Sequence, residues 1–325
     1  MVRYIIRRLL MLIPVIIGVV LIVFVLNELS SGDPARIVAG AEASAESVEE
    51  MRETLGLNRP FLVRFGDYIL GVFSRGDLGN SFLTKQPVLG EVLTRFPTTL
   101  LLTLASMVFT ISIGIPFGII SATRQYSWLD NLCTTIGLIG VSMPVFWEGL
   151  MSILIFSIWL NWLPPSGFYG WKYWILPAIT IGTGLAAQVM RMTRSGMLDV
   201  IRQEYIQSAR AKGLGEGTVI RKHALKNALI PIITVIGMEF GTSLGGAVIT
   251  ETVFSIPGLG KYMVDALRAR DYPVVQGGVL VLAVMFSIVT LFVDVLYTFV
   301  DPRLKSQYRS KAGNLSVRKT KEQVA

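Results

Sequence analysis

The stretch RQEYIQSARAKGLGEGTVIRKHALKN, residues 202–227, is the longest polar and basic interruption in a chain dominated by apolar runs. Its first half carries apolar residues at helical spacing, which predicts a short helix with one apolar side. These residues are Tyr205, Ile206, Ala209 and Leu214. Gly213 is typical of a helix end, and two further glycines follow before a second helical pattern over residues 218–229. We expect two short helices around a glycine-rich corner.

The basic charge of this stretch has two interpretations. An ATPase partner docks on it, with Ala209 close to the partner surface and Arg210 and Lys212 reaching acidic groups of that partner. Alternatively, the stretch lies at the membrane surface and binds anionic lipid headgroups, as juxtamembrane basic segments do. Charge alone does not separate the two.

The rest of the chain reads as an all-α polytopic membrane protein. It has 325 residues, of which 52% are hydrophobic and 16% are charged, whereas a soluble protein carries about 25% charged residues. Apolar runs of about 18 residues or more meet the criterion for a membrane span. Six spans are predicted, at residues 9–26, 98–122, 132–160 (broken at Pro144), 173–189, 230–249 and 277–300.

The distribution of cations predicts the orientation. Arg3, Arg7 and Arg8 precede the first span, and the central basic stretch and the tail carry most of the remaining charge. Placing both termini in the cytoplasm satisfies the positive-inside rule at each cytoplasmic segment. A cleaved signal peptide is the alternative for the first span. The apolar run is long for a signal core, and the small residues at 43–45 lie far beyond its end.

Residues 30–95 are polar and lie outside in this orientation. Two short helices are expected there, at 45–55 and 60–73, and the second has an apolar stripe: Phe61, Phe65, Ile69 and Phe73. Such a stripe either packs against the membrane part of the same chain or contacts a protein that delivers substrate. Residues 301–325 form a basic tail without periodicity.

The sequence lacks the residue sets that several kinds of functional site require. His223 is the single histidine and Cys133 the single cysteine, so neither a histidine metal cluster nor a disulfide within the chain can form. Residues 258–261 lack the spacing of a phosphate loop, and no basic face with aromatic platforms suggests nucleic acid. The chain is therefore not expected to be an enzyme by itself or to hold a cofactor or metal, and energy must come from partners.

Ionisable and polar residues inside apolar spans raise the free energy of membrane insertion. They therefore indicate either hydrogen bonding between helices or a transport path. The candidates are Glu148, Gln188, Glu239 and Asp294. Hydrogen bonds between helices are favoured for Glu239 and Asp294. Glu148 follows Pro144, and we take it as the leading candidate for lining the path.

Two runs of sequence carry a family resemblance. ARAKGL followed by HALKNALIP, and GGAVITETVFSIPGLGKYMVDALRARDYPVVQG, closely resemble permease subunits of the peptide/nickel class of ATP-binding-cassette importers. The head, residues 1–34, is similar too. Gln207-Ser208-Ala209 stands where the family signature has Glu-Ala-Ala, and Gly213 is in register. His223-Ala224-Leu225-Lys226 stands at the I-x-L-P end of that signature. The signature Glu and Pro are absent, as in the peptide/nickel branch.

The resemblance implies the architecture of a type I importer permease. It implies an N-terminal helix at 1–29, an outer helical region at 30–95, a five-helix core at 96–300 with a coupling loop at 191–228, and a cytoplasmic tail at 301–325. The implied ATPase-coupling residues are Gln207, Ser208, Ala209, Arg210, Ala211, Lys212, Gly213, Leu214 and His223.

The same resemblance implies partners and cargo. The partners would be a second permease subunit, two ATPase subunits holding ATP and Mg²⁺, an extracytoplasmic solute-binding protein and membrane lipid. The cargo would be di- or oligopeptides, with nickel complexes or glutathione as alternatives. A stand-alone secondary transporter would predict internal repeats with broken helices, and no such repeat is visible. A membrane anchor or assembly factor without a transport path is the remaining alternative.

Overall fold

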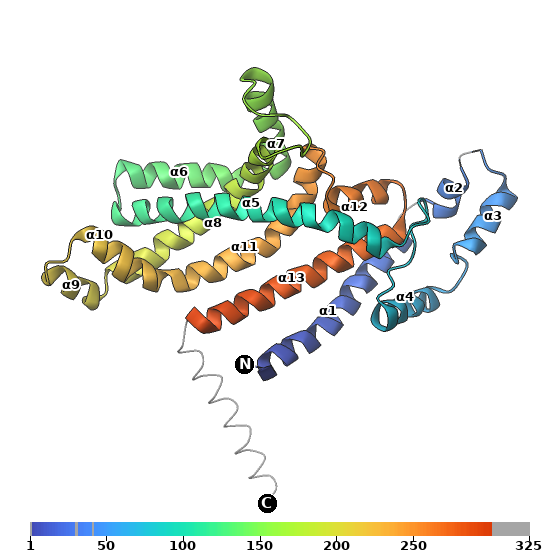
Figure 1. The fold of residues 1–325 in the computed structure, drawn as a ribbon, viewed down its shortest axis with the longest axis horizontal. Helices are drawn as coiled ribbons and strands as arrows, with labels where there is room; N and C mark the ends of the chain where they lie inside the picture. The colour runs from blue at the N-terminus through green and yellow to red at the C-terminus, as the bar shows by residue number, and fades with distance from the viewer. Residues whose placement is uncertain (1, 30–31, 41, 301–325) are drawn as a thin grey trace, which may run out of the picture.

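The computed structural model describes residues 2–29, 32–40 and 42–300, and over these ranges the chain forms helices and no β-sheet (Figure 1). The elements in chain order are α1 (Val2–Leu29), α2 (Pro34–Ala39), α3 (Ala45–Thr54), α4 (Phe61–Arg75), α5 (Val88–Thr123), α6 (Trp128–Ser142), α7 (Val145–Ser152), the π-helix η1 (Ile153–Trp159), α8 (Lys172–Ile201), α9 (Glu204–Ala211), α10 (Glu216–Thr218), the π-helix η2 (Val219–Ala224), α11 (Leu225–Val253), α12 (Leu259–Arg268) and α13 (Tyr272–Val300).

Five of these helices are long and apolar enough to cross a membrane, and the number rises to six if a bent pair is counted as one span. The five lie in α1, α5, α8, the α10–α11 run and α13; the pair is α6 with α7 and η1. Each of the six predicted spans falls on one of them. The prediction of an all-α polytopic membrane protein is confirmed.

The bend between α6 and α7 is 105° and follows from Pro144. Proline has no backbone N–H and disfavours helical backbone in the residue before it. Met143 is accordingly extended, with φ −80° and ψ 128°, and Pro144 caps the new helix. In Figure 1, α7 projects sideways from the long helices. The predicted break at Pro144 is confirmed.

Helix α8 lies at the centre of the bundle, in contact with α5, α6, α7 and α11. Its approach to α5 depends on glycines. A Cβ on Gly114 would lie 2.8 Å from the Ala186 carbonyl oxygen, and one on Gly118 would lie 2.5 Å from Thr193 Cβ. Small residues allow membrane helices to approach this closely.

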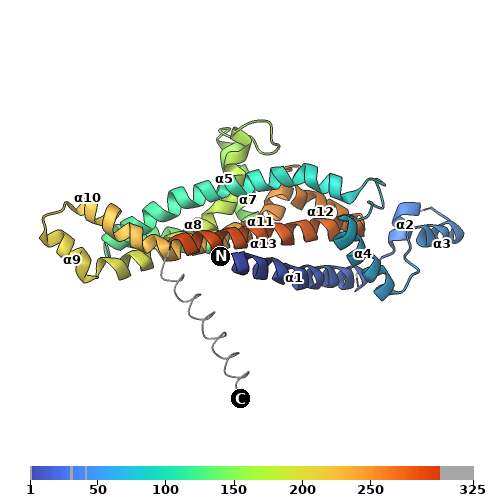
Figure 2. The same ribbon diagram turned by 60° about the horizontal axis from the view of Figure 1, so that its bottom comes forward.

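Helices α1 and α13 pair beside this core, and α4 covers their outer end (Figure 2). Phe24 of α1 packs edge-on against Phe61 and Phe65 of α4, with ring centroids 6.2 and 5.6 Å away. Ile69 packs on the same cluster, whereas Phe73 is 48% exposed. Three of the four stripe residues therefore pack within the chain, as one of the two interpretations predicts.

Some helix ends differ from the sequence prediction. α5 begins at Val88 instead of residue 98, and α8 continues to Ile201 instead of ending at 189. Residues 191–201, predicted as the start of the basic loop, are thus helical. Thr193, Gly196 and Met197 of this stretch are buried, and Arg194 pairs with Asp130 of α6. The tail at 301–325 lies outside the described residues.

Candidate functional site

The basic corner, defined here as residues 202–224, lies at one end of the long helices, opposite α2, α3 and α4 (Figure 1). α8 leads into α9 with only Arg202 and Gln203 between them. Gly213 then turns the chain with φ +77°, the left-handed conformation that glycine adopts at no steric cost. Its N–H donates to the Arg210 carbonyl oxygen at 2.9 Å. The predicted helix end at Gly213 is confirmed.

The apolar side of α9 faces the chain itself. Ile206 is fully buried and Ala209 is only 7% exposed, in a cluster that joins α9 to α5, α8, η2 and α11. The other buried members are Ala122, Val189, Met197, Val219, Ile220, Ala224, Ala228 and Ile232. The expectation that Ala209 faces a partner is therefore wrong. Tyr205 and Leu214, expected on the same apolar side, are 44% and 40% exposed, and Leu214 lies beyond the end of α9, after the turn at Gly213.

Two polar contacts hold the corner in shape. Arg210 donates from Nε and Nη2 to the two carboxylate oxygens of Glu216, at 3.0 and 2.6 Å. Asn227 Nδ2 donates to the Tyr205 hydroxyl at 2.8 Å, which ties α9 to α11. The acid that Arg210 was expected to find on a partner is thus supplied by this chain. The pair raises the pKa of the Arg210 guanidinium, chiefly through its hydrogen bonds to Glu216.

What the corner presents outward is polar and cationic. Of the predicted coupling residues, seven are exposed: Gln207, Ser208, Arg210, Ala211, Lys212, Gly213 and Leu214. Arg202, Arg221, Lys222 and Lys226 are exposed nearby. His223 is half-buried, and its carbonyl oxygen accepts a hydrogen bond from Asn227. Such a surface suits an acidic protein face, since exposed cations are available at a fixed spacing.

The candidate path residues lie on four different helices, α7, α8, α11 and α13. Glu148 is 9% exposed on α7, a helix that packs against α8. Gln188 is half-buried on α8. Glu239 is 7% exposed and accepts from Thr242 of its own helix at 2.8 Å, not from another helix. The Asp294 side chain lies outside the described residues.

A buried carboxylate that sequence reasoning missed closes the outer end of α11. Glu251 is fully buried and accepts hydrogen bonds from Thr99 Oγ1 at 2.5 Å and from the Lys261 N–H at 2.9 Å. A Cβ on Gly258 would lie 2.2 Å from the Glu251 carboxyl carbon, so a glycine is required there. Glu251 thus joins α5, α11 and α12. The sequence pattern that could have indicated this site is an acidic residue within an apolar run, followed by two closely spaced glycines.

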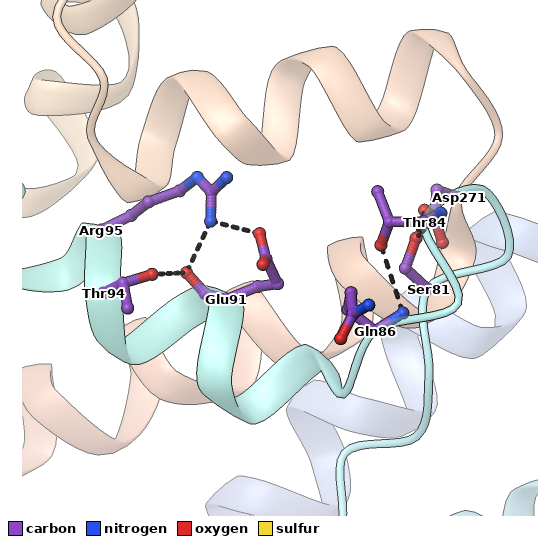
Figure 3. A network of polar contacts seen from close by, with 7 residues as sticks. All are labelled: Ser81, Thr84, Gln86, Glu91, Thr94, Arg95 and Asp271. Atoms are coloured by element: carbon purple, nitrogen blue, oxygen red, sulfur yellow. Dashed lines mark hydrogen bonds and ion pairs between the residues drawn. The ribbon is translucent and has the colours of Figure 1, made fainter.

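The outer loops are fixed by a second polar network (Figure 3). Asp271, at the turn between α12 and α13, accepts from the Ser81 hydroxyl and from the Phe82 N–H. Arg95 donates to Glu91 of the same helix at 2.5 Å and lies 4.0 Å above the Tyr262 ring. These contacts join the loop before α5 to α12 and to the turn before α13.

Another buried pair, also missed, lies near the basic corner. Asp130 is 3% exposed in the first turn of α6. Arg194 of α8 donates to both of its carboxylate oxygens at 2.9 Å. The two residues are 64 positions apart, and no spacing pattern connects them.

Comparisons with known proteins agree with this arrangement. The model of the family described as "Binding-protein-dependent transport system inner membrane component" matches residues 114–306, and that of its N-terminal part matches residues 1–103. A dipeptide transport system permease protein of Alkalihalophilus pseudofirmus is 45% identical over 94% of this chain and all of its own length. A glutathione transport system permease protein of Escherichia coli K12 is 42% identical over 94% of this chain and 99% of its own.

A solved structure shares the fold. An inward-facing form of the MetNI methionine ABC transporter contains a chain with a TM-score of 0.54 and 19% identity. The match covers 66% of this chain and 97% of that one.

Proposed function

The chain belongs to the family of binding-protein-dependent transport system inner membrane components, and from this premise we propose that it is a permease subunit of an ATP-driven importer of short peptides. The permease forms the path through the cytoplasmic membrane. We assign ATP and Mg²⁺ to two ATPase subunits. A second permease of the same kind completes the path.

The rigid basic corner is the observation that carries this proposal. An element that transmits the movement of an ATPase must be rigid, because a flexible one would deform instead. The corner is held by buried Ile206 and Ala209, by the Arg210–Glu216 pair and by the Tyr205–Asn227 hydrogen bond. It continues directly from α8, the central helix of the bundle. We assign its exposed face to an acidic groove of the ATPase, so that both termini lie in the cytoplasm.

The outer region is assigned to the solute-binding protein. Residues 32–95 lie at the opposite end from the corner, and their loops are fixed to α12 and α13 through Asp271 (Figure 3). In this scheme, ATP binding closes the ATPases, moves the corner and α8, and turns the two permeases from inward-facing to outward-facing.

The substrate class follows from chemistry and from two relatives. Their names specify dipeptide and glutathione transport, and glutathione is itself a tripeptide. Glu148 is a buried carboxylate beside the bend between α6 and α7, where it would complement the ammonium group of a peptide. Glutathione carries the same ammonium group, so we take di- or oligopeptides as the cargo and keep glutathione as the alternative.

Reconstitution tests the proposal. The chain is purified with the tagged ATPases, second permease and binding protein encoded beside it, and placed in vesicles. We expect uptake of a radiolabelled dipeptide that requires hydrolysable ATP, with excess dipeptide competing better than glutathione or a nickel chelate. The importer assignment would be refuted if the chain purified with no ATPase bound, or if an ion gradient drove uptake without ATP.

A further inference from the structure

The Asp130 carboxylate joins four segments of the chain. Arg194 of α8 donates from Nε to Oδ1 and from Nη2 to Oδ2, both at 2.9 Å. The Ser121 hydroxyl of α5 donates to Oδ1, and the Tyr126 N–H in the α5–α6 turn donates to Oδ2 at 3.0 Å. Asp130 is 3% exposed and the Arg194 side chain 29%. A two-bond fork of this kind fixes direction as well as distance.

The Arg194 side of this pair is continuous with the basic corner. Arg194 is seven residues before Ile201, where α8 ends and the chain enters α9. Between them, Met197 is fully buried in the same apolar cluster as Ile206 of α9. A displacement of the corner is therefore carried into α8 at the position of Arg194.

The Asp130 side leads to the bent span. α6 packs against α5 and α8, while much of its remaining surface is apolar and exposed. Asp130 supplies the side-chain bonds that tie α6 to its neighbours. After the 105° bend at Pro144, the chain continues as α7, which packs against α8 and carries the buried Glu148. A force on Asp130 thus acts on the helix that positions the leading path residue.

We propose that Asp130 and Arg194 are a positioning pair, which makes α6 and the bent α7 move with α8 when the basic corner is displaced. Apolar contact between α6 and α8 would allow one helix to slide or rotate on the other. The charged fork opposes this, because its two bonds have a fixed geometry in a site largely closed to water. The proposal rests on the proposed function, since the displacement comes from ATPase subunits docked on the corner.

The test is a neutral pair, Asp130→Asn with Arg194→Gln, which leaves no unpaired buried charge. The control is Ser121→Ala, which removes a hydrogen bond to the same carboxylate and keeps the α6–α8 fork. Each is purified with its ATPases, and peptide transported per ATP hydrolysed is measured in vesicles, with thermal stability and ATPase retention alongside. We expect the neutral pair to retain its ATPases and lose roughly tenfold or more in transport per ATP, the factor expected for losing a charge-assisted bond.

The Ser121→Ala control separates positioning from stabilisation. It should lower thermal stability slightly and leave transport per ATP near the unsubstituted value. A second readout is maleimide labelling of Phe146→Cys, 52% exposed on α7, in a Cys133→Ser background. ATP should change the labelling rate with the natural pair and not with the neutral pair.

Three results would overturn the proposal. They are normal transport per ATP in the neutral pair, an equal loss in Ser121→Ala, and ATP-dependent labelling of α7 that persists without the pair. Failure of the proposed function itself is distinguishable, because the unsubstituted chain would then lack bound ATPases or ATP-driven uptake before any variant is compared.

Discussion

Ala209→Asp should unfold the basic corner locally, whereas Ala211→Asp on the same helix should not. Ala209 is 7% exposed in an apolar cluster, while Ala211 is exposed two residues later. Placing an unpaired carboxylate in such a cluster costs about 3 kcal/mol, at the lower end of the effective penalty for a buried ion. The poorer helix propensity of Asp and its position near the helix C-terminus add about 1 kcal/mol at either position.

Hydrogen exchange followed by mass spectrometry measures this difference directly. In Ala209→Asp, the amides of α9 and η2 should lose protection by roughly 1,000-fold, corresponding to the combined cost of about 4 kcal/mol. In Ala211→Asp, we expect a loss of roughly fivefold from propensity and helix dipole alone. Equal loss in both variants, or none in Ala209→Asp, would show that the apolar side of α9 does not hold the corner, and the rigid-corner argument would fail.

Three further outcomes follow. Gly213→Val should uncouple ATP hydrolysis from transport, because a β-branched residue disfavours φ +77° by about 1–2 kcal/mol. Gly213→Asn should have a smaller effect, and full coupling in Gly213→Val would contradict this. Gly118→Ala should lower the stability of the purified chain by about 1–3 kcal/mol, because its Cβ overpacks against Thr193. Gly90→Ala has open space around its Cβ and should not lower it; equal melting temperatures of the two variants would contradict this. Glu148→Gln should lower peptide transport with ATPase retention unchanged; normal transport with normal stability would remove Glu148 from the path.

The spans, the Pro144 break and the Gly213 turn could be predicted from sequence because each depends on local chemistry. Apolar run length determines membrane insertion, and backbone preferences of proline and glycine act within a few residues. The direction of Ala209 could not be predicted this way. Helical spacing groups apolar residues on one side, but it does not say whether that side meets the same chain or a partner.

The missed site residues depend on contacts between distant segments. Asp130 and Arg194 looked like ordinary cytoplasmic charges, because nothing in the two local sequences connects them. Glu251 and Gly258 lie closer in sequence, yet the need for glycine appears only once α12 folds back over the end of α11. In each case a long-range contact decided the burial of a charge, which local pattern does not encode.

Photo-crosslinking tests most directly whether the basic corner docks an ATPase. A benzophenone amino acid replaces Leu214, 40% exposed on the corner, and in a control replaces Tyr169, 80% exposed in the loop before α8. Both chains are irradiated in native membranes that contain the importer's ATPase subunits. The account predicts a crosslink to the ATPase from position 214 and none from 169. Crosslinking of position 214 to lipid alone would show that the corner is a basic membrane-surface segment and would contradict the account.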